Sequence, residues 1–235
     1  MNYETLHKLA FLKRDEILKN HTRINFENFS NLLGEIEQDP FIGFVGEDFE
    51  NEEVKVLFLG KSNAPSTLKH HEIDRQINSA LQTFKNSQNN YRAYANKYLE
   101  AMPRWDIMQF VTEFRNQTHL KLNQIAYANI VPWRYDGSPN GATYELGFKY
   151  FTNQFIEAIE PNLIIPLGSK LKTDIKKYLY AENEIHISNG INRSFYFIGR
   201  DKRITEEGWQ TISEAVDDYF VIKDNFIEKR KVNEK

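Results

Sequence analysis

The first fifty residues have the hydrophobic spacing of helices. In residues 3–20, one helical face collects Leu6, Leu9, Ala10, Lys13 and Ile17. The spacing in residues 24–40 predicts a second, shorter helix that ends at Pro40. Residues 44–53 are rich in Asp and Glu and are expected to form an acidic loop. The pattern therefore predicts an N-terminal helical extension over residues 1–50.

From Val54 onward, short apolar runs alternate with amphipathic stretches. The expected strands are 54–60, 125–133, 161–168 and 194–200, and the expected helices are 71–87, 91–102, 105–116, 142–160, 169–180 and 206–220. Such alternation predicts an α/β fold of three layers, αβα, over residues 51–222. The middle layer is a mostly parallel four-stranded sheet. Residues 223–235 are expected to form a frayed or disordered C-terminal tail.

Ligands of open α/β sheets bind at the carboxyl ends of the strands, so site residues are expected at the ends of the predicted strands. The first strand is followed by Lys61, Ser62, Asn63 and, after Ala64, Pro65. This segment matches neither the P-loop pattern nor the dinucleotide fingerprint. It could present backbone N–H groups and the Asn63 amide to a ligand. Equally, it could be a simple turn that caps the next helix.

The second strand carries Asn129 inside an apolar run. A buried amide must find hydrogen-bond partners, and its acceptor and donor groups match the edge of a pyrimidine base. The alternative is a structural asparagine that binds neighbouring backbone. After the fourth strand, Arg200, Lys202 and Arg203 stand close together, with Arg193 upstream, and could bind phosphates or form a solvated charged turn.

Composition excludes several kinds of chemistry. The 235 residues contain no cysteine, which rules out disulfides, thiol nucleophiles and cysteine-bound metal clusters. The sequence has no cluster of His, Asp and Glu with ligand spacing, so we predict no metal and no cofactor. The start has no signal-peptide core, and no apolar stretch approaches the ~18 residues of a membrane span. A cytoplasmic protein without a membrane partner is expected.

Charge is distributed unevenly along the chain. The formal net charge is −3, but residues 66–124 carry eight Lys/Arg against five Asp/Glu, whereas residues 1–65 carry seven against twelve. A basic middle segment in an acidic chain is compatible with a local phosphate-binding face. Random scatter of charges is the alternative.

The order of these strand ends resembles that of the uracil-DNA glycosylase superfamily. "VLFLGKSNAPS" looks like the catalytic loop after the first strand of that family. "IAYANIVPWR" looks like the strand with the base-reading asparagine, and Asn129 takes its position. "IEPNLIIPLGSKL" looks like the third strand and its turn. The resemblance spans roughly Val54 to Tyr219.

Two motifs depart from that family. Its members usually place Asp, Asn or Glu two residues after the glycine, where this chain has Ser62, and Asn63 stands one position later. No His-Pro-Ser segment follows the fourth strand. Arg200 stands nearer its expected place, and the nearby histidine, His186, lies in a segment expected to be a short edge segment or loop.

The resemblance implies a role for each candidate residue. Asn63 would orient a water molecule, and Arg200 or His186 would stabilise the leaving base. Asn129 would read the base beside Gly60 and Ser62, and Trp105 would stack on it, unless Trp105 is a core residue. The residues implied in binding DNA are Lys61, Arg193, Lys202 and Arg203.

Three functional hypotheses follow. The first is a DNA glycosylase that hydrolyses the N-glycosidic bond of uracil or a related base in single- or double-stranded DNA. The second is a catalytically inactive module on the same fold, which binds a nucleobase, DNA or a protein partner. The third, an α/β enzyme for a small metabolite, is disfavoured by the motif order. The first two require the side chains of Asn63 and Asn129 to converge, and a separation above ~10 Å would remove their shared role.

Overall fold

The computed structural model describes residues 1–52, 54–64, 68–102, 108–167, 185–188, 191–195, 206, 210, 220–223 and 226–229. Its α-helices are α1 Tyr3–Leu9, α2 Arg14–Leu18, α3 Leu68–Asn86, α4 Tyr91–Ala101, α5 Met108–Thr118, α6 Gly141–Gly147 and α7 Asn153–Ile159. Its strands are β1 Phe44–Val45, β2 Val56–Asn63, β3 Ile125–Arg134, β4 Leu163–Pro166, β5 Ile185–Ser188, β6 Ile191–Phe195, β7 Phe220–Lys223 and β8 Phe226–Lys229. Shorter helical turns are η1 Phe26–Asn28, η2 Gly34–Gln38, η3 Phe49–Asn51, η4 Gln88–Asn90, η6 Leu122–Gln124 and the π-helical η7 Phe148–Thr152.

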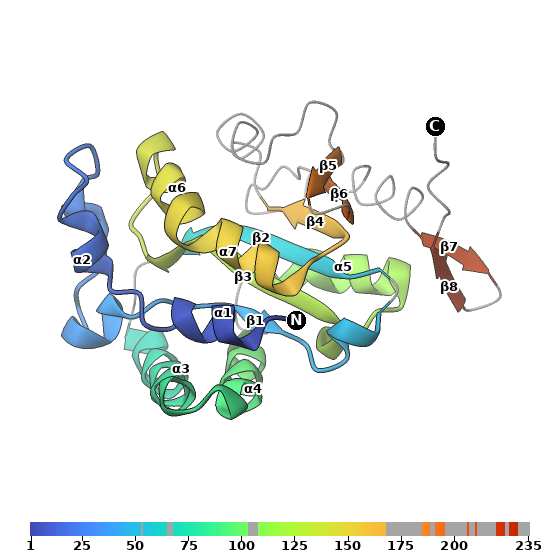
Figure 1. The fold of residues 1–235 in the computed structure, drawn as a ribbon, viewed down its shortest axis with the longest axis horizontal. Helices are drawn as coiled ribbons and strands as arrows, with labels where there is room; N and C mark the ends of the chain where they lie inside the picture. Colours follow the sequence, from blue (N-terminus) through green and yellow to red (C-terminus); the bar gives the residue numbers. More distant parts are fainter. Residues whose placement is uncertain are drawn as a thin grey trace.

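A mixed sheet with helices packed against it forms the centre of the protein (Figure 1). Its strand order is β1-β3-β2-β4-β6-β5, and the four inner strands are mutually parallel. This confirms the predicted α/β class and the mostly parallel sheet. Two antiparallel edge strands extend the predicted set of four: β1 lies inside the expected acidic loop, and β5 contains His186.

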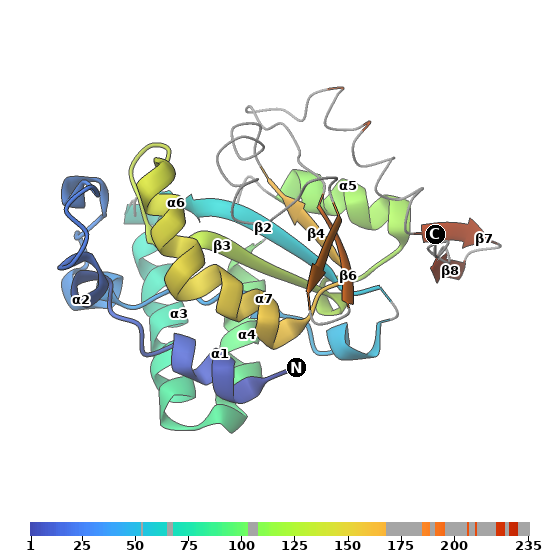
Figure 2. The same cartoon turned by 45° about the horizontal axis from the view of Figure 1, so that its top comes forward.

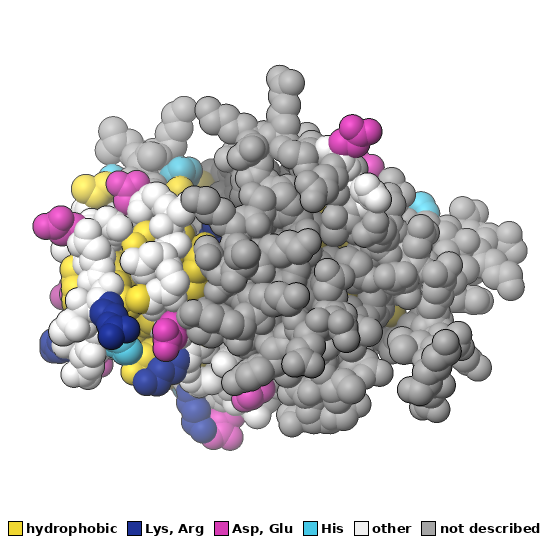
Figure 3. Space-filling view, turned by 90° about the horizontal axis from the view of Figure 1, so that it is seen from above, with side chains coloured by type: hydrophobic (Ala, Val, Ile, Leu, Met, Phe, Trp, Pro, Cys, Tyr) yellow, Lys and Arg dark blue, Asp and Glu magenta, His cyan; other side chains and the backbone are white. Residues whose placement is uncertain are grey.

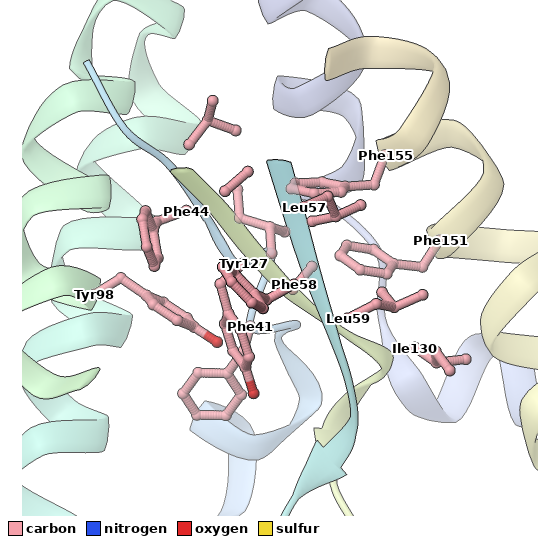
Figure 4. Close-up of a cluster of buried hydrophobic side chains, with 14 of the residues drawn as sticks. Phe41, Phe44, Leu57, Phe58, Leu59, Tyr98, Tyr127, Ile130, Phe151 and Phe155 are labelled. Carbon is pink, nitrogen blue, oxygen red and sulfur yellow. The ribbon is translucent and has the colours of Figure 1, made fainter. Parts of the chain in front are cut away.

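Both faces of β2, β3 and β4 are buried, as their continuous apolar runs predict. Successive strand residues point to opposite faces. Leu57 faces Phe151 and Phe155, which come from the continuous helix α6–η7–α7, whereas Tyr127 faces Tyr98 of α4 (Figure 4). From another direction, α6 and α7 are seen crossing one face of the sheet, with α3 and α4 on the other (Figure 2).

The N-terminal fifty residues are less helical than predicted. The stretch 3–20 is divided into α1 and α2, and residues 24–40 form only the short turns η1 and η2. Gly34 has φ +61°, a left-handed conformation that interrupts an α-helix. Glu37 accepts hydrogen bonds from the Ser30 hydroxyl (2.7 Å) and the Leu33 N–H (3.0 Å), which holds the chain in this compact turn. The proposed domain boundary at residue 50 stays a prediction.

The C-terminal segment also differs from expectation. Residues 226–229 of the expected tail form β8, which pairs antiparallel with β7, and Lys223 is the register partner of Phe226. Residues 224–225 and 230–235 lie outside the described residues. Strand-favouring residues such as Val221, Ile222 and Ile227 account for this pairing. The expected helix 169–180 and residues 196–200 of the fourth strand lie outside the described residues. Of the helices that the structure describes, none has the length and apolar character needed to cross a bilayer.

Candidate functional site

The strongest candidate site lies at the carboxyl end of β2. The chain leaves β2 for β3 on one side and later enters β4 on the other, so β2 borders a topological switch point of the parallel sheet. Crevices at such points are the usual ligand sites of open α/β sheets. The strand does not end at Gly60 as predicted but continues through Lys61 and Ser62 to Asn63.

A chain of three side chains, which we call the amide relay, joins β3 to the end of β2. The Tyr127 hydroxyl donates to Asn129 Oδ1 at 2.9 Å, and Asn129 Nδ2 donates to Asn63 Oδ1 at 3.0 Å. Asn129 is only 1% exposed, whereas Asn63 is partly exposed. The two asparagines that were expected to converge are therefore in direct contact.

Gly60 provides the space that the relay occupies. Its Cα is the register partner of Asn129 on the neighbouring strand. A Cβ at this position would collide with Asn129 Oδ1 and would come within 2.8 Å of the Tyr127 hydroxyl. Gly60 was expected to touch a base, but its visible role is to let the Asn129 amide lie across β2.

A register shift brings Asn63 into the relay. Ser62 pairs with Val131, but the next residue, Asn63, pairs with Arg134, so β3 has two extra residues at this point. One of them is Pro132, which has no N–H to donate to the sheet. Strict alternation would put Ser62, not Asn63, on the face of Asn129. The irregularity redirects the Asn63 side chain toward Asn129, which is a common effect of bulges near functional sites.

The relay ends in an unused donor. Asn63 Nδ2 is buried and makes no hydrogen bond to the residues that the structure describes. Buried N–H groups are nearly always paired, because an unpaired one loses the hydrogen bonds that water would supply. An oxygen acceptor from a ligand or from water is therefore expected at this point.

The first turn of α3 contributes a second nitrogen of this kind. His71 Nε2 is buried and has no hydrogen-bond partner among the described residues. Its place in the sequence, beside His70 in a helix, carries no functional signal. Only the fold brings this end of α3 to the carboxyl end of β2. Asp74, three residues after His71, accepts a hydrogen bond from Arg134 of β3, and Arg134 also donates to the Ala64 carbonyl.

Arg134 and Asp74 form what we call the clamp. Arg134 Nε donates to Asp74 Oδ2 at 2.8 Å, Nη2 donates to the other carboxylate oxygen, and Nη1 donates to the Ala64 carbonyl. The guanidinium also lies 5.2 Å from the ring centre of Phe41. Arg134 is 5% exposed and Asp74 is 1% exposed. The clamp fixes the backbone next to Asn63, a role that the sequence did not reveal.

The backbones of His186 and Arg193 lie away from the relay. They are register partners on β5 and β6. Ser194, the next residue of β6, is level with Leu163, the first residue of β4, and thus with the start of β2. Asn63 is seven residues further along β2, which corresponds to roughly 20 Å at the usual rise of a strand. The structure thus does not bring the His186 backbone to the end of β2 where Asn63 lies.

The remaining candidates add little to the site as described. Lys61 and Ser62 are half-buried in β2 beside Asn63. The other four lie outside the described residues, so their roles stay predictions: Trp105, Arg200, Lys202 and Arg203. Among the described side chains, no group of three or more His, Asp and Glu is arranged to hold a metal ion.

The basic middle segment contributes α3, α4 and α5, but several of its cations are engaged within the chain. Lys85 pairs with Asp39, and Lys97 pairs with Glu100. Arg92 and Arg115 donate to backbone carbonyls. In the view from above, the described side chains of both signs are interspersed (Figure 3). Because these four cations are engaged within the chain, they give no separate support for a phosphate-binding face.

Comparison with models of known protein families and with curated proteins finds no match to this chain.

Proposed function

We propose that this chain is a uracil-DNA glycosylase-like protein that accepts a base, extruded from DNA, at the carboxyl ends of β2 and β3. The observation that carries the proposal is the contact between Asn63 and Asn129, 66 residues apart in the chain and joined at 3.0 Å. The register shift after Ser62 also compensates for the displaced position of Asn63, because it turns that side chain toward the base-reading asparagine of the resemblance.

The proposed reaction is hydrolysis of the N-glycosidic bond. The bond between C1′ of the sugar and the base nitrogen breaks, and its electron pair stays with the base. The oxygen of a water molecule bonds to C1′, and a water proton neutralises the base anion. Donors fixed in advance near the developing negative charge are worth several kcal/mol in such reactions. An extruded base can reach donors in a pocket that it could not reach inside the duplex.

Excision of uracil tests this proposal directly. The protein is incubated in excess with single- and double-stranded oligonucleotides that contain one uracil, and abasic products are cleaved with alkali. We expect cleavage at the uracil, and a loss of about 10²–10³-fold in Asn63→Ala if its amide stabilises charge in the reaction. Asn123→Ala is the matched control, because Asn123 is also a half-buried asparagine with a side-chain partner, Asp48. If neither the single-stranded nor the double-stranded oligonucleotide gives a product, hydrolysis of the N-glycosidic bond of uracil in DNA is ruled out.

A second candidate is a module that binds a base, DNA or a protein partner without excision. The observation in its favour is that Asn63 Oδ1 already accepts from Asn129, so only one lone pair of this oxygen is left to orient a water molecule. For its DNA-binding form, uracil-containing or abasic DNA should be retarded in a gel at low salt without being cleaved. If neither DNA is retarded, that form of the candidate fails.

A further inference from the structure

We propose that Asn140 is a site of spontaneous deamidation, in which water replaces the nitrogen of the side-chain amide, and that the N-cap contacts of α6 set the rate. Asn140 and Gly141 belong to residues 135–141, which lead from the carboxyl end of β3 into α6. An asparagine followed by glycine is the pair in which this reaction is fastest, because glycine has no Cβ to hinder its backbone nitrogen. The inference goes beyond the proposed function and does not depend on it.

The reaction proceeds through a cyclic imide. The backbone nitrogen of Gly141 attacks Cγ of Asn140, a C–N bond forms, and the amide nitrogen leaves as ammonia with the N–H proton. Water then opens the resulting succinimide. Cleavage of the bond to Cγ gives aspartate, whereas cleavage of the original peptide bond gives isoaspartate, in which the backbone runs through Cγ.

The surroundings of the pair allow this reaction. Asn140 and Gly141 are both exposed, as is every residue of 136–138. A Cβ built on Gly141 would meet no atom within 4 Å, so the space on that side of the backbone is open. Water can therefore reach the pair, and the backbone at Gly141 has room to change its conformation.

The N-cap contacts hold Asn140 away from the reactive geometry. Asn140 Oδ1 accepts from the Thr143 N–H at 2.9 Å and from the Thr143 hydroxyl at 3.0 Å. The backbone of Asn140 is extended, with ψ at 175°. Ring closure requires a turn about this bond, because the succinimide is a flat ring that contains both Cγ and the Gly141 nitrogen. The cap must therefore open before the ring can close.

The two products act differently on α6. Aspartate at position 140 still offers an oxygen to the Thr143 N–H, and its negative charge is favourable at the start of a helix. Isoaspartate lengthens the backbone by one carbon, which displaces that oxygen and removes the cap. The helix that starts here continues through η7, where Thr152 donates to the carbonyl of Ile130, the residue after Asn129 on β3. The reaction thus adds charge at the edge of the sheet that carries the relay.

Ageing of the purified full-length protein tests the proposal. The protein is incubated at mildly alkaline pH, digested, and mapped by mass spectrometry, which detects deamidation as a gain of about one dalton. Enzymatic methylation measures the isoaspartate. We expect both products to accumulate in the peptide that contains Asn140. Mapping separates this peptide from that of the other Asn-Gly pair, Asn189–Gly190, which lies outside the described residues.

Gly141→Ala tests the attacking group. Its methyl group fits into the open space but hinders the backbone nitrogen, so deamidation of Asn140 should slow at least about tenfold. A rate equal to that of wild type would exclude attack by this nitrogen as the route.

Thr143→Val tests the cap. It removes the hydroxyl that donates to Asn140 and keeps the size of the side chain, so deamidation should become about fivefold faster, the factor that one hydrogen bond produces. Thr118→Val is the matched control, because Thr118 is also buried and its hydroxyl donates to Phe114 instead. Its rate should equal that of wild type. Circular dichroism verifies that both variants are folded.

Unfolding the protein in guanidinium chloride gives a second measure of the cap and keeps the test open if Thr143→Val does not fold. The unfolded chain lacks the cap, so its Asn140 should react faster than in the folded protein. Absence of a mass gain at Asn140 in the folded protein, while the unfolded chain reacts, would overturn the proposed site. Equal rates in the folded and unfolded protein would overturn the role of the cap. Neither result depends on whether uracil is excised.

Discussion

The clamp and the amide relay are buried polar clusters that meet at the end of β2, yet they differ in one respect. In the clamp, both oxygens of Asp74 accept from Arg134, which also satisfies the Ala64 carbonyl. In the relay, each bond leads to the next until Asn63 Nδ2, which has no partner among the described residues. A closed network holds the fold together, whereas an open one indicates where a ligand could complete it.

The cluster around Asp39 belongs with the clamp in this comparison. Asp39 accepts from Lys13 at 2.6 Å and from Gln82 at 2.6 Å, and it pairs with Lys85 at 2.8 Å. It ties the N-terminal segment to α3. It also explains why a lysine occupies the apolar face predicted for residues 3–20: Lys13 reaches a buried carboxylate.

The largest expected effect comes from opening the clamp. Arg134→Ala would leave the Asp74 carboxylate buried without its ion-pair partner, which costs about 3–5 kcal/mol in the free energy of unfolding. Urea denaturation measures this loss. Arg23→Ala, which removes an exposed arginine, should stay within about 0.5 kcal/mol of wild type. A loss for Arg134→Ala as small as the control's would show that the clamp does not stabilise the fold.

Next in size is the effect of filling the space beside the relay. Gly60→Ala places a methyl group against Asn129 Oδ1, so the strands must shift or the relay must break, at a cost of about 1–3 kcal/mol. Thermal and urea denaturation report the change. Gly141→Ala is the control, because a Cβ there meets no atom within 4 Å. If both variants behaved alike, the packing of Asn129 over Gly60 would be disproved.

A smaller loss of stability is expected when the Asp39 carboxylate is protonated at low pH. Burial raises the pKa of its carboxyl, but hydrogen bonds and charge from Lys13 and Lys85 outweigh burial and hold the pKa below its usual value. Its contribution is therefore complete above the unfolded-state pKa of about 3.9 and is lost as the pH falls through the lower folded-state value. Denaturation midpoints of wild type and Asp39→Asn should converge below about pH 4. Midpoints that stay apart as the pH falls further would contradict this role of Asp39.

The smallest effect on stability should come from the open end of the relay. Asn63→Ala removes one hydrogen bond from a partly exposed side chain, so we expect a loss of about 1 kcal/mol in the free energy of unfolding. The same substitution should lower excision of uracil from DNA by about 10²–10³-fold. A loss of stability as large as that of Arg134→Ala, with excision of uracil retained, would make Asn63 part of the framework instead.

Much of the inner architecture was predictable from local pattern. The apolar runs at 54–60 and 125–133 became β2 and β3, and the stretch 91–102 became α4, because strand and helix periodicity report directly on burial. The helix predicted for residues 24–40 was wrong, because Gly34 and the side-chain contacts of Glu37 favour compact turns over a helix. Similarly, the two edge strands are too short, or too dependent on a neighbouring strand, to be identified by periodicity.

The candidate site also has features that the sequence predicted and features that only the fold showed. The sequence was sufficient to select Gly60, Asn63 and Asn129, since a glycine and two amides at the ends of apolar runs are chemically conspicuous. It could not show that the register shifts after Ser62, that Tyr127 orients the first amide, or that Arg134 closes on a helix 60 residues away. Those features depend on which strands become neighbours and at what register, and long-range packing sets both. The folded chain therefore determined that both ends of the Asn129 amide are engaged and that Asn63 Nδ2 has no partner among the described residues.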